Sequence, residues 1–428
     1  LFRFFFFFLQ VQTKYLFYMD SIQVNSEIGR LEGVILHTPG PEIEQMIPGN
    51  IHEALYSDLL NLNIASKEYA TFKGVFSKWA KTYQVVDLLS QVLDNSDVRK
   101  SLLSTILKVE NREFLMEEML PLTSADLARF LIEGYPFKEG VHPKEFAANE
   151  FLLNPLYNLF FTRDASSSMY NQVVIHSMRT TVRDRESYIM EAIFKNCFHA
   201  ETLAPKTYAG ATTEGGDLLI AKDDVLFIGC GGRTNPKGIQ YMVDNFIQKK
   251  KKQHIIVQEL PLEPDSFIHL DMVFTMLAQD RCMVFSPLIL ANNTPYHSTH
   301  IEIDNGKVQY HEHKNFLEAT KRVGFDFNPI LCGGNDVRYQ HREQWHSGAN
   351  FFALGEGKVI GYSRNTHTID ALANAGFAVL KAEDVCQDRV NMNDYERFVV
   401  TFDAAELPRG GGGARCMTMP VRRAPVNW

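Results

Sequence analysis

Cysteine and excess positive charge are both scarce in this sequence. Six cysteines are spread over 428 residues. They lack the paired spacing typical of a disulfide framework or a zinc knuckle, so we expect a reducing, cytoplasmic setting. The net charge is -8. Since duplex phosphate requires a basic face, this balance argues against nucleic acid as a partner, and it suits a cationic substrate.

The apolar run near the start of the chain, residues 4–9, is too short to span a bilayer. It also lacks a clear small-residue cleavage site, so we predict neither a membrane partner nor a secretory address. We expect the protein to begin at Met19. Residues 1–18 would then be a non-native or disordered extension, and residues 19–428 a single catalytic domain.

Hydrophobic residues make up 45% of the chain and charged residues 22%, which is typical of a globular protein with a large core. Short β-rich runs bounded by Gly, Pro or Asn recur along the chain, at residues 34–37, 173–176, 225–228, 254–257, 282–285 and 359–362. Amphipathic stretches separate these runs. The alternation predicts the α/β class.

Strand signals fade between about residue 75 and residue 148. Thr123 and Asp126 form a capping box ahead of Leu127 and Leu131, and Gly134 provides a stop. We therefore predict a helical insertion over residues 75–148.

A thiol near the C-terminus stands beside four glycines, at residues 410–413, and is followed by the apolar stretch 417–421. That apolar character predicts a buried end rather than a loose tail, and the glycines would give a substrate room to reach the sulfur of Cys416. Cys230 and Cys332 are each followed by two glycines as well. The residues alone therefore leave three candidate nucleophiles.

An imidazole and three carboxylates lie upstream in distinctive settings. His269 and Asp271 are two residues apart, so strand periodicity would place both side chains on one face. Glu214 precedes two glycines just before a strand-like run, and Asp164 ends the stretch 161–164. With a thiol, this set suits nucleophilic attack on a cationic carbon such as that of a guanidinium group. A structural His–Asp hydrogen bond and a plain tight turn are the alternatives.

A metal site is a further alternative, because four histidines follow within a few dozen residues: His297, His300, His311 and His313. They lie in polar stretches that predict a loop or a solvated hairpin. A metal-dependent hydrolase using His269, Asp271 and these histidines would lose activity with a chelator. We nevertheless predict no metal and no organic cofactor.

Six ordered motifs give the chain a specific resemblance: residues 34–40, 158–164, 214–217, 269–273, 342–345 and 416–418. From Ser26 to the C-terminus it resembles the arginine deiminases of the guanidino-group-modifying superfamily. The resemblance implies a pentein-like α/β propeller of five ββαβ modules around a central site, with 75–148 as the family's helical subdomain. It also makes a homo-oligomer plausible.

The resemblance implies a hydrolysis of L-arginine to L-citrulline and ammonia. Cys416 would attack as a thiolate, Asp164 and Asp271 would clamp the guanidinium, and His269, oriented by Glu214, would transfer protons. The attack would form a covalent amidino-cysteine, which water then hydrolyses.

Substrate binding is implied at four further positions. Arg183 and Arg233 match positions that bind the amino acid's carboxylate, and Asn158 and Phe161 match residues that line the pocket. Surface ion pairing is the ordinary alternative for the arginines.

The chain departs from the usual family pattern at several positions. Gly411 stands where an arginine is usual, Arg415 where a histidine is usual, Met419 in place of a common cysteine, and Gly232 in place of a glutamate. These changes leave a modified arginine or another guanidine as an alternative substrate. An amidinotransferase, which passes the amidino group to an amine, is the rival reaction.

Overall fold

The computed structural model describes residues 21–51, 56–146, 150–250 and 252–428. The extension predicted at 1–18 lies outside the described residues.

Five sheets share one pairing pattern, in which a middle strand pairs antiparallel with one neighbour and parallel with the other. The middle strands are β1 (Leu31–Leu36), β6 (Gln172–Ile175), β9 (Val225–Cys230), β12 (Arg281–Val284) and β17 (Lys358–Tyr362). The antiparallel neighbours, in the same order, are β20 (Met419–Arg423), β5 (Ser166–Met169), β8 (Leu218–Lys222), β11 (Phe274–Ala278) and β16 (Phe352–Gly355). The parallel neighbours are β2 (Lys81–Gln84), β7 (Glu201–Leu203), β10 (Gln253–Glu259), β15 (Asn328–Leu331) and β19 (Phe398–Phe402).

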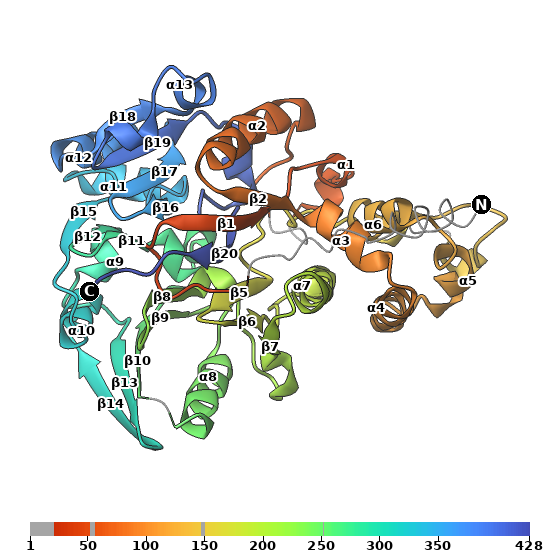
Figure 1. Ribbon diagram of the computed structural model, residues 1–428, viewed down its shortest axis with the longest axis horizontal. Coiled ribbons are helices and arrows are strands. Elements are labelled where there is room, and N and C mark those ends of the chain that lie inside the picture. The colour runs from red at the N-terminus through yellow and green to blue at the C-terminus, as the bar shows by residue number, and fades with distance from the viewer. Residues whose placement is uncertain (1–20, 52–55, 147–149, 251) are drawn as a thin grey trace, which may run out of the picture.

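Two of these sheets carry extra strands. β13 (Ser298–Asp304) and β14 (Lys307–His313) extend the sheet of β8, β9 and β10, and β18 (Ala378–Lys381) pairs parallel with β19. A separate pair joins β3 (Tyr135–Pro136) to β4 (Phe151–Leu153). Figure 1 shows the five larger sheets grouped around the middle of the molecule. No ladder between named strands of the described ranges joins one of these sheets to the next. The α/β class is confirmed, and the five-module propeller stays a prediction.

The helices lie on the connections, because parallel strands need a crossover. They are α1 (Pro41–Glu44), α2 (Leu62–Trp79), α3 (Val85–Leu93), α4 (Ser96–Val109), α5 (Met116–Met119), α6 (Ser124–Glu133), α7 (Asp184–Cys197), α8 (Pro236–Gln248), α9 (Ser286–Ile289), α10 (Phe316–Arg322), α11 (Val337–Trp345), α12 (Thr366–Asn374) and α13 (Ala382–Cys386). Within the described ranges, none of the helices has the length and apolar character needed to cross a bilayer.

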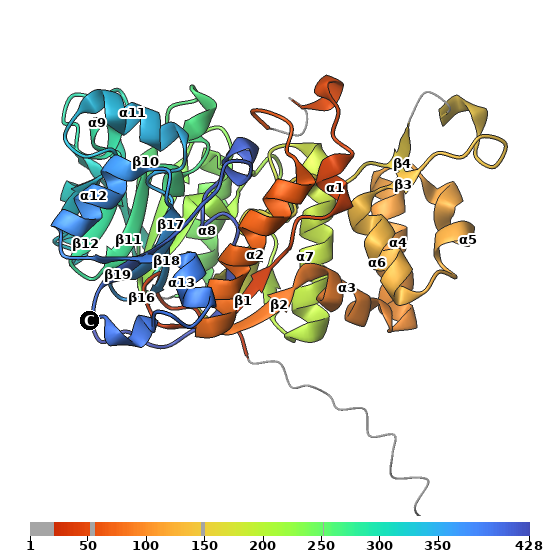
Figure 2. The same ribbon diagram turned by 90° about the horizontal axis from the view of Figure 1, so that it is seen from above.

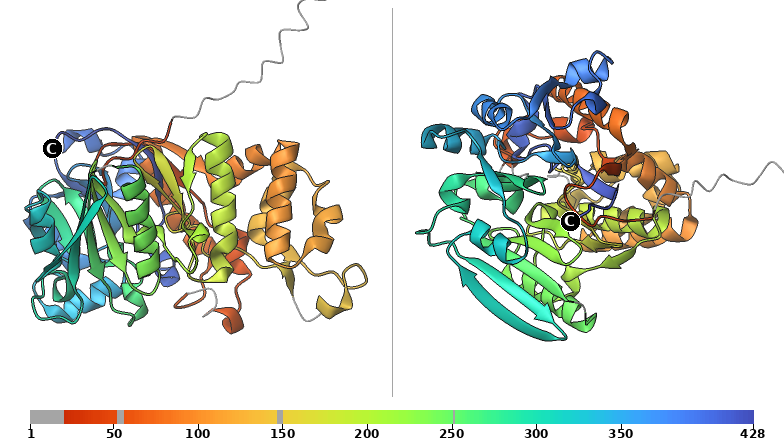
Figure 3. Two further views of the ribbon diagram at one scale, coloured as in Figure 1. Left: turned by 90° about the horizontal axis from the view of Figure 1, so that it is seen from below. Right: turned by 60° about the vertical axis from the view of Figure 1, so that its left-hand side comes forward.

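Helices α3 to α6 form a lobe at one end of the molecule (Figures 2 and 3). The N-cap bond of the predicted capping box is confirmed, since the Thr123 side chain accepts a hydrogen bond from the Asp126 amide at 3.1 Å. The Asp126 carboxylate accepts from the Thr123 hydroxyl at 2.7 Å. Gly134 ends α6 with φ +95°. Strand β2 also falls inside the range 75–148 that the sequence predicted to be helical, and it pairs with β1 in the body of the fold.

Candidate active site

The loops that hold the predicted site residues occupy one recurring place in the fold. Each loop comes directly before the antiparallel edge strand of a different sheet: Asp164 before β5, Glu214 before β8, His269 and Asp271 before β11, and Cys416 before β20. Edge strand β5 contacts β20, and β11 contacts β16. Residues far apart in the sequence are therefore brought to one place, where these five side chains are between 0% and 4% exposed.

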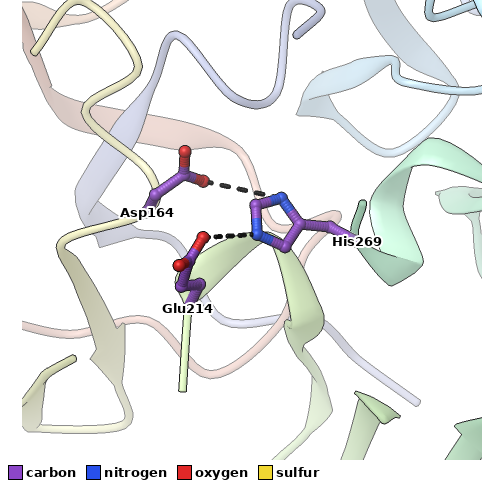
Figure 4. A group of neighbouring side chains, drawn as sticks. All are labelled: Asp164, Glu214 and His269. Atoms are coloured by element: carbon purple, nitrogen blue, oxygen red, sulfur yellow. Dashed lines mark hydrogen bonds and ion pairs between the residues drawn. The ribbon is translucent and has the colours of Figure 1, made fainter. Parts of the chain in front are cut away.

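His269 lies between two carboxylates (Figure 4). Its Nε2 is 2.9 Å from Glu214 Oε2, and its Nδ1 is 3.8 Å from Asp164 Oδ1. The prediction that His269 and Asp271 share a strand face was wrong. His269 instead precedes the 3₁₀ turn Leu270–Met272, just as Glu214 precedes the 3₁₀ turn Gly215–Asp217. Two matching turns, rather than one strand, therefore aim the imidazole at the carboxylate.

A glycine between these turns allows the close approach. A Cβ added at Gly216 would lie 2.4 Å from His269 Nδ1. Since real Cβ contacts are not this short, any larger residue would push the ring away from Glu214. The glycine before the predicted strand thus serves His269 directly.

The charges around the ring set its protonation. Burial alone would lower the pKa of His269, but Asp164 and Glu214 outweigh it and raise that pKa to about 9. Burial would likewise raise the pKa of Glu214, yet the hydrogen bond and charge of His269, with Arg233, hold it at about 2. At neutral pH the pair is an imidazolium and a carboxylate, so His269 can donate a proton.

The thiol of Cys416 faces Asp271 and Asn350. Its Sγ is 3.8 and 4.0 Å from the two Asp271 oxygens, and Asn350 Nδ2 is 3.3 Å from the sulfur. Burial, then Asp271 and Asp164, raise the pKa of Cys416 well above its usual value. In the free protein the sulfur therefore carries its proton.

The other two candidate cysteines lie in different surroundings. Burial raises the pKa of Cys230 to about 12, with further contributions from Asp217 and Glu259. Burial raises the pKa of Cys332 to about 12 as well, and its sulfur accepts a hydrogen bond from Thr368 Oγ1 at 3.7 Å. Neither sulfur makes the contacts with Asp271 and Asn350 that the sulfur of Cys416 makes.

Arg415 is buried and paired with two carboxylates. Its guanidinium donates to both Glu27 oxygens at 3.0 Å and to Asp271 Oδ2 at 2.8 Å. Carbonyl oxygens of Leu218 and Gly215 accept its remaining contacts at 2.9 and 3.4 Å. Arg415 therefore holds Asp271 Oδ2, which is also 3.8 Å from the sulfur, and leaves Oδ1, 4.0 Å from the sulfur, without a guanidinium partner among the described residues.

Asp164 has the same half-occupied form. Arg183 Nη1 donates to Asp164 Oδ2 at 2.7 Å, while the buried Oδ1 has no hydrogen-bond partner among the described residues. Since a buried carboxylate oxygen without a donor is costly, this atom marks a place for a cation.

The predicted substrate-binding residues lie around this centre. Arg183 makes four hydrogen bonds, two to Glu186, one to Asp164 and one to the Asn158 carbonyl, so it supports Asp164 in this structure. Arg233 Nη1 lies 3.7 Å from Glu214 Oε1 without a hydrogen bond. Asn158 is buried.

The glycine run does not open a path to the sulfur, which corrects that part of the interpretation. A Cβ at Gly412 would lie 2.5 Å from the Phe161 ring, and one at Gly413 would lie 2.6 Å from Asn350 Oδ1. The space that the glycines leave is filled by Phe161 and Asn350. These two residues therefore pack directly against the loop that carries Cys416.

The residues of the predicted metal alternative lie at two separate places. Asp164, Glu214 and His269 offer ligand atoms within 4.8 Å of one another. A metal there would have to displace the proton from His269. Of the later histidines, His300 lies on β13, His311 and His313 lie on β14, and His297 directly precedes β13, at the outer edge of their sheet (Figure 1).

Two residues of this centre were missed by the sequence reasoning. Asn350 accepts from the Arg415 amide at 2.8 Å and donates to the Asp271 carbonyl at 3.1 Å, while Glu27 holds Arg415. Asn350 stands between Ala349 and Phe351 in an apolar stretch. A lone polar side chain in such a run is the signal that could have identified it.

Solved structures define the class to which this fold belongs. An amidinotransferase of the saxitoxin biosynthetic pathway from Microseira wollei matches 95% of this chain and 98% of its own with a TM-score of 0.52 at 15% identity. A dimethylarginine dimethylaminohydrolase matches 91% and 99% with a TM-score of 0.51 at 13% identity. The chain thus has the α/β fold of the pentein amidinotransferases.

The family follows from closer relatives. Residues 52–423 match the model of the arginine deiminase family. Arginine deiminase of Borrelia recurrentis is 30% identical over 432 residues, covering 96% of this chain and all of the relative, and that of Mycoplasma capricolum is 30% identical over 421 residues, covering 95% and 98%. The chain belongs to the arginine deiminase family, whose members are hydrolases of the guanidino C–N bond.

Proposed function

We propose that this protein hydrolyses L-arginine to L-citrulline and ammonia through a covalent amidino-cysteine on Cys416. The observation that carries the proposal is the pair of half-occupied carboxylates. Asp164 Oδ1 has no hydrogen-bond partner, and Asp271 Oδ1 contacts the Cys416 thiol, among the described residues. A guanidinium, which has several N–H donors in one plane, can take one oxygen from each.

The substrate itself would activate the thiol. Two carboxylates raise the pKa of Cys416 in the free protein, and a bound guanidinium between them would reverse that effect. Asp271, 3.8 Å from the sulfur, can accept the thiol proton. The nucleophile would therefore form only when a cation is bound.

Attack by sulfur on the guanidinium carbon would form a C–S bond and a tetrahedral adduct. The imidazolium of His269 would then protonate the leaving nitrogen, the C–N bond would break, and ammonia would depart. The neutral imidazole, oriented by Glu214, would take a proton from water as that water attacks the amidino carbon. The C–S bond would break, the sulfur would regain its proton, and the ureido product would leave.

Binding of the amino acid's carboxylate is proposed at Arg233 and Arg183. Arg233 is the better placed of the two, because its Nη1 makes no hydrogen bond among the described residues, whereas Arg183 already holds Asp164. Asn158 and Phe161 would line the pocket. Since Phe161 packs against the loop of Cys416, either the Phe161 side chain or this loop would move for the substrate to reach the sulfur.

The test is release of ammonia and citrulline from L-arginine with chelator present, for the wild type and for Cys416→Ala. Equal amounts of both products, lost in the variant, would support the proposal. Loss with chelator would favour the metal-dependent hydrolase, and an amidino product formed from an added amine would favour the amidinotransferase. Turnover of a modified arginine without turnover of L-arginine would identify the modified arginine as the substrate.

The same proposal extends to the architecture. We propose that the five sheets of identical pairing pattern are the modules of a propeller, with 19–428 as one domain and 75–148 as its helical subdomain. The four matching loops before β5, β8, β11 and β20 support this arrangement. A homo-oligomer is proposed from the family resemblance, and a cytoplasmic location from the six cysteines without paired spacing.

A further inference from the structure

Four histidines gather on one face of the outer strands β10, β13 and β14. In the strand register His300 lies directly opposite His311, His313 lies opposite Ser298, and His254 lies opposite Glu302. Residues opposite one another, or two apart along one strand, point to the same side of a sheet. The four imidazoles therefore share a face with the Glu302 carboxylate.

The rings are close enough to share an ion. His254 Nδ1 is 2.9 Å from His300 Nε2, and the ring centroids of this pair are 5.1 Å apart. His300 is 5.6 Å from the ring of His311 and 6.2 Å from that of His313. Imidazoles on a tetrahedral zinc, with Zn–N of about 2 Å, have centroids roughly 5 Å apart. In the present ring orientations no three of these four described histidines offer nitrogens within 4.8 Å of one another, so the rings would have to rotate to hold one ion.

One ring nitrogen of the cluster lacks a partner. His313 Nε2 is buried and has no hydrogen-bond partner among the described residues. A neutral imidazole nitrogen is a common metal ligand.

We propose that this histidine cluster binds one divalent transition-metal ion of the Zn²⁺ type, with His300 as the central ligand. His254 and His311 or His313 complete the set from the two neighbouring strands. The ion would link the hairpin of β13 and β14 to β10. In the strand order of this sheet the hairpin lies at the end away from β8, and therefore away from the site of Cys416 (Figure 1). The site is independent of the proposed hydrolysis.

The experiment is a calorimetric titration of chelator-treated, full-length protein with Zn²⁺, repeated with Co²⁺ to record its visible absorption. We expect one ion per cluster and a higher melting temperature with the ion. His300→Gln and the exposed His311→Gln should each weaken binding by at least about tenfold, because even an outer-shell partner is worth about 10- to 100-fold in affinity. His297→Gln, an exposed histidine of the same segment, is the matched control.

Unchanged binding in His300→Gln would overturn the proposal, as would equal loss in His297→Gln. Loss of binding in His269→Gln instead would assign the ion to the group of Asp164, Glu214 and His269. His311 is on the exposed edge strand, so His311→Gln is expected to fold. If His300→Gln does not fold, unchanged binding in His311→Gln would overturn the proposal.

Discussion

Glu214→Gln removes one of the two carboxylates that keep His269 protonated. The lost partner is 2.9 Å from the ring, while Asp164 stays at 3.8 Å. A nearby opposite charge raises a histidine pKa by about 1 to 3 units, and because Asp164 remains we expect a fall of about 1 to 2 units. With a starting value of about 9, the protonated fraction at pH 8 falls from about nine-tenths to between about one-tenth and one-half.

The sign of the effect follows from the direction of the shift. The folded pKa of His269 lies above its ordinary value, so its stabilising contribution is present at low pH and is lost as pH rises through about 9. Activity that needs the imidazolium is lost over the same range. In Glu214→Gln both losses should begin at lower pH, and the alkaline limb of kcat/KM should move down by about 1 to 2 units.

The assay is the pH profile of kcat/KM for L-arginine, with the His269 ring titrated by NMR alongside. Glu343→Gln is the matched control, because Glu343 is also buried but caps α12 through the amides of His367 and Thr368 at 2.9 and 2.8 Å. An unchanged alkaline limb in Glu214→Gln, or the same movement in the control, would refute the assignment of Glu214 to His269.

Three further variants test the centre. Cys416→Ala should abolish both turnover and the covalent adduct seen by mass spectrometry, whereas Cys332→Ala should retain both; the opposite result would move the nucleophile. Arg415→Met leaves two buried carboxylates without their guanidinium partner. It should therefore lower the free energy of unfolding, measured in denaturant, by about 3 to 5 kcal/mol. A loss below about 1 kcal/mol would contradict the pairing. Gly412→Ala places a Cβ against Phe161, so it should lower the free energy of unfolding by about 1 to 3 kcal/mol and reduce turnover. Wild-type turnover would show that the loop rearranges to accommodate the added Cβ.

The middle strands were predictable from the sequence because both of their faces are buried. β6 and β9 read as continuous apolar runs, and their side chains are almost all buried in the structure. Edge strand β5 was not predicted, since its sequence is Ser166 to Ser168 followed by Met169. Its small polar residues carry no strand period, and only its pairing with β6 makes it a strand.

The site was predictable in its reactive groups but not in its supports. His269 and Glu214 stand in motifs from which their chemistry can be recognised. Glu27 and Asn350 act by holding Arg415 and Cys416. The residues alone left three candidate cysteines, because all three precede glycines or follow them in the chain, and only the family resemblance selected Cys416. Burial and partners, which a linear sequence does not contain, separate Cys416 from Cys332.

On the proposed mechanism, charge governs both the start and the end of the cycle. Burial, together with the carboxylates of Asp271 and Asp164, keeps the Cys416 thiol protonated in the free protein, so a neutral molecule of similar shape would not generate the thiolate. Hydrolysis turns the cationic guanidinium into a neutral ureido group. The two carboxylates then lose their cationic partner, the sulfur recovers its high pKa, and the product no longer binds as the substrate did. The same arrangement that holds back the nucleophile therefore favours release of the product.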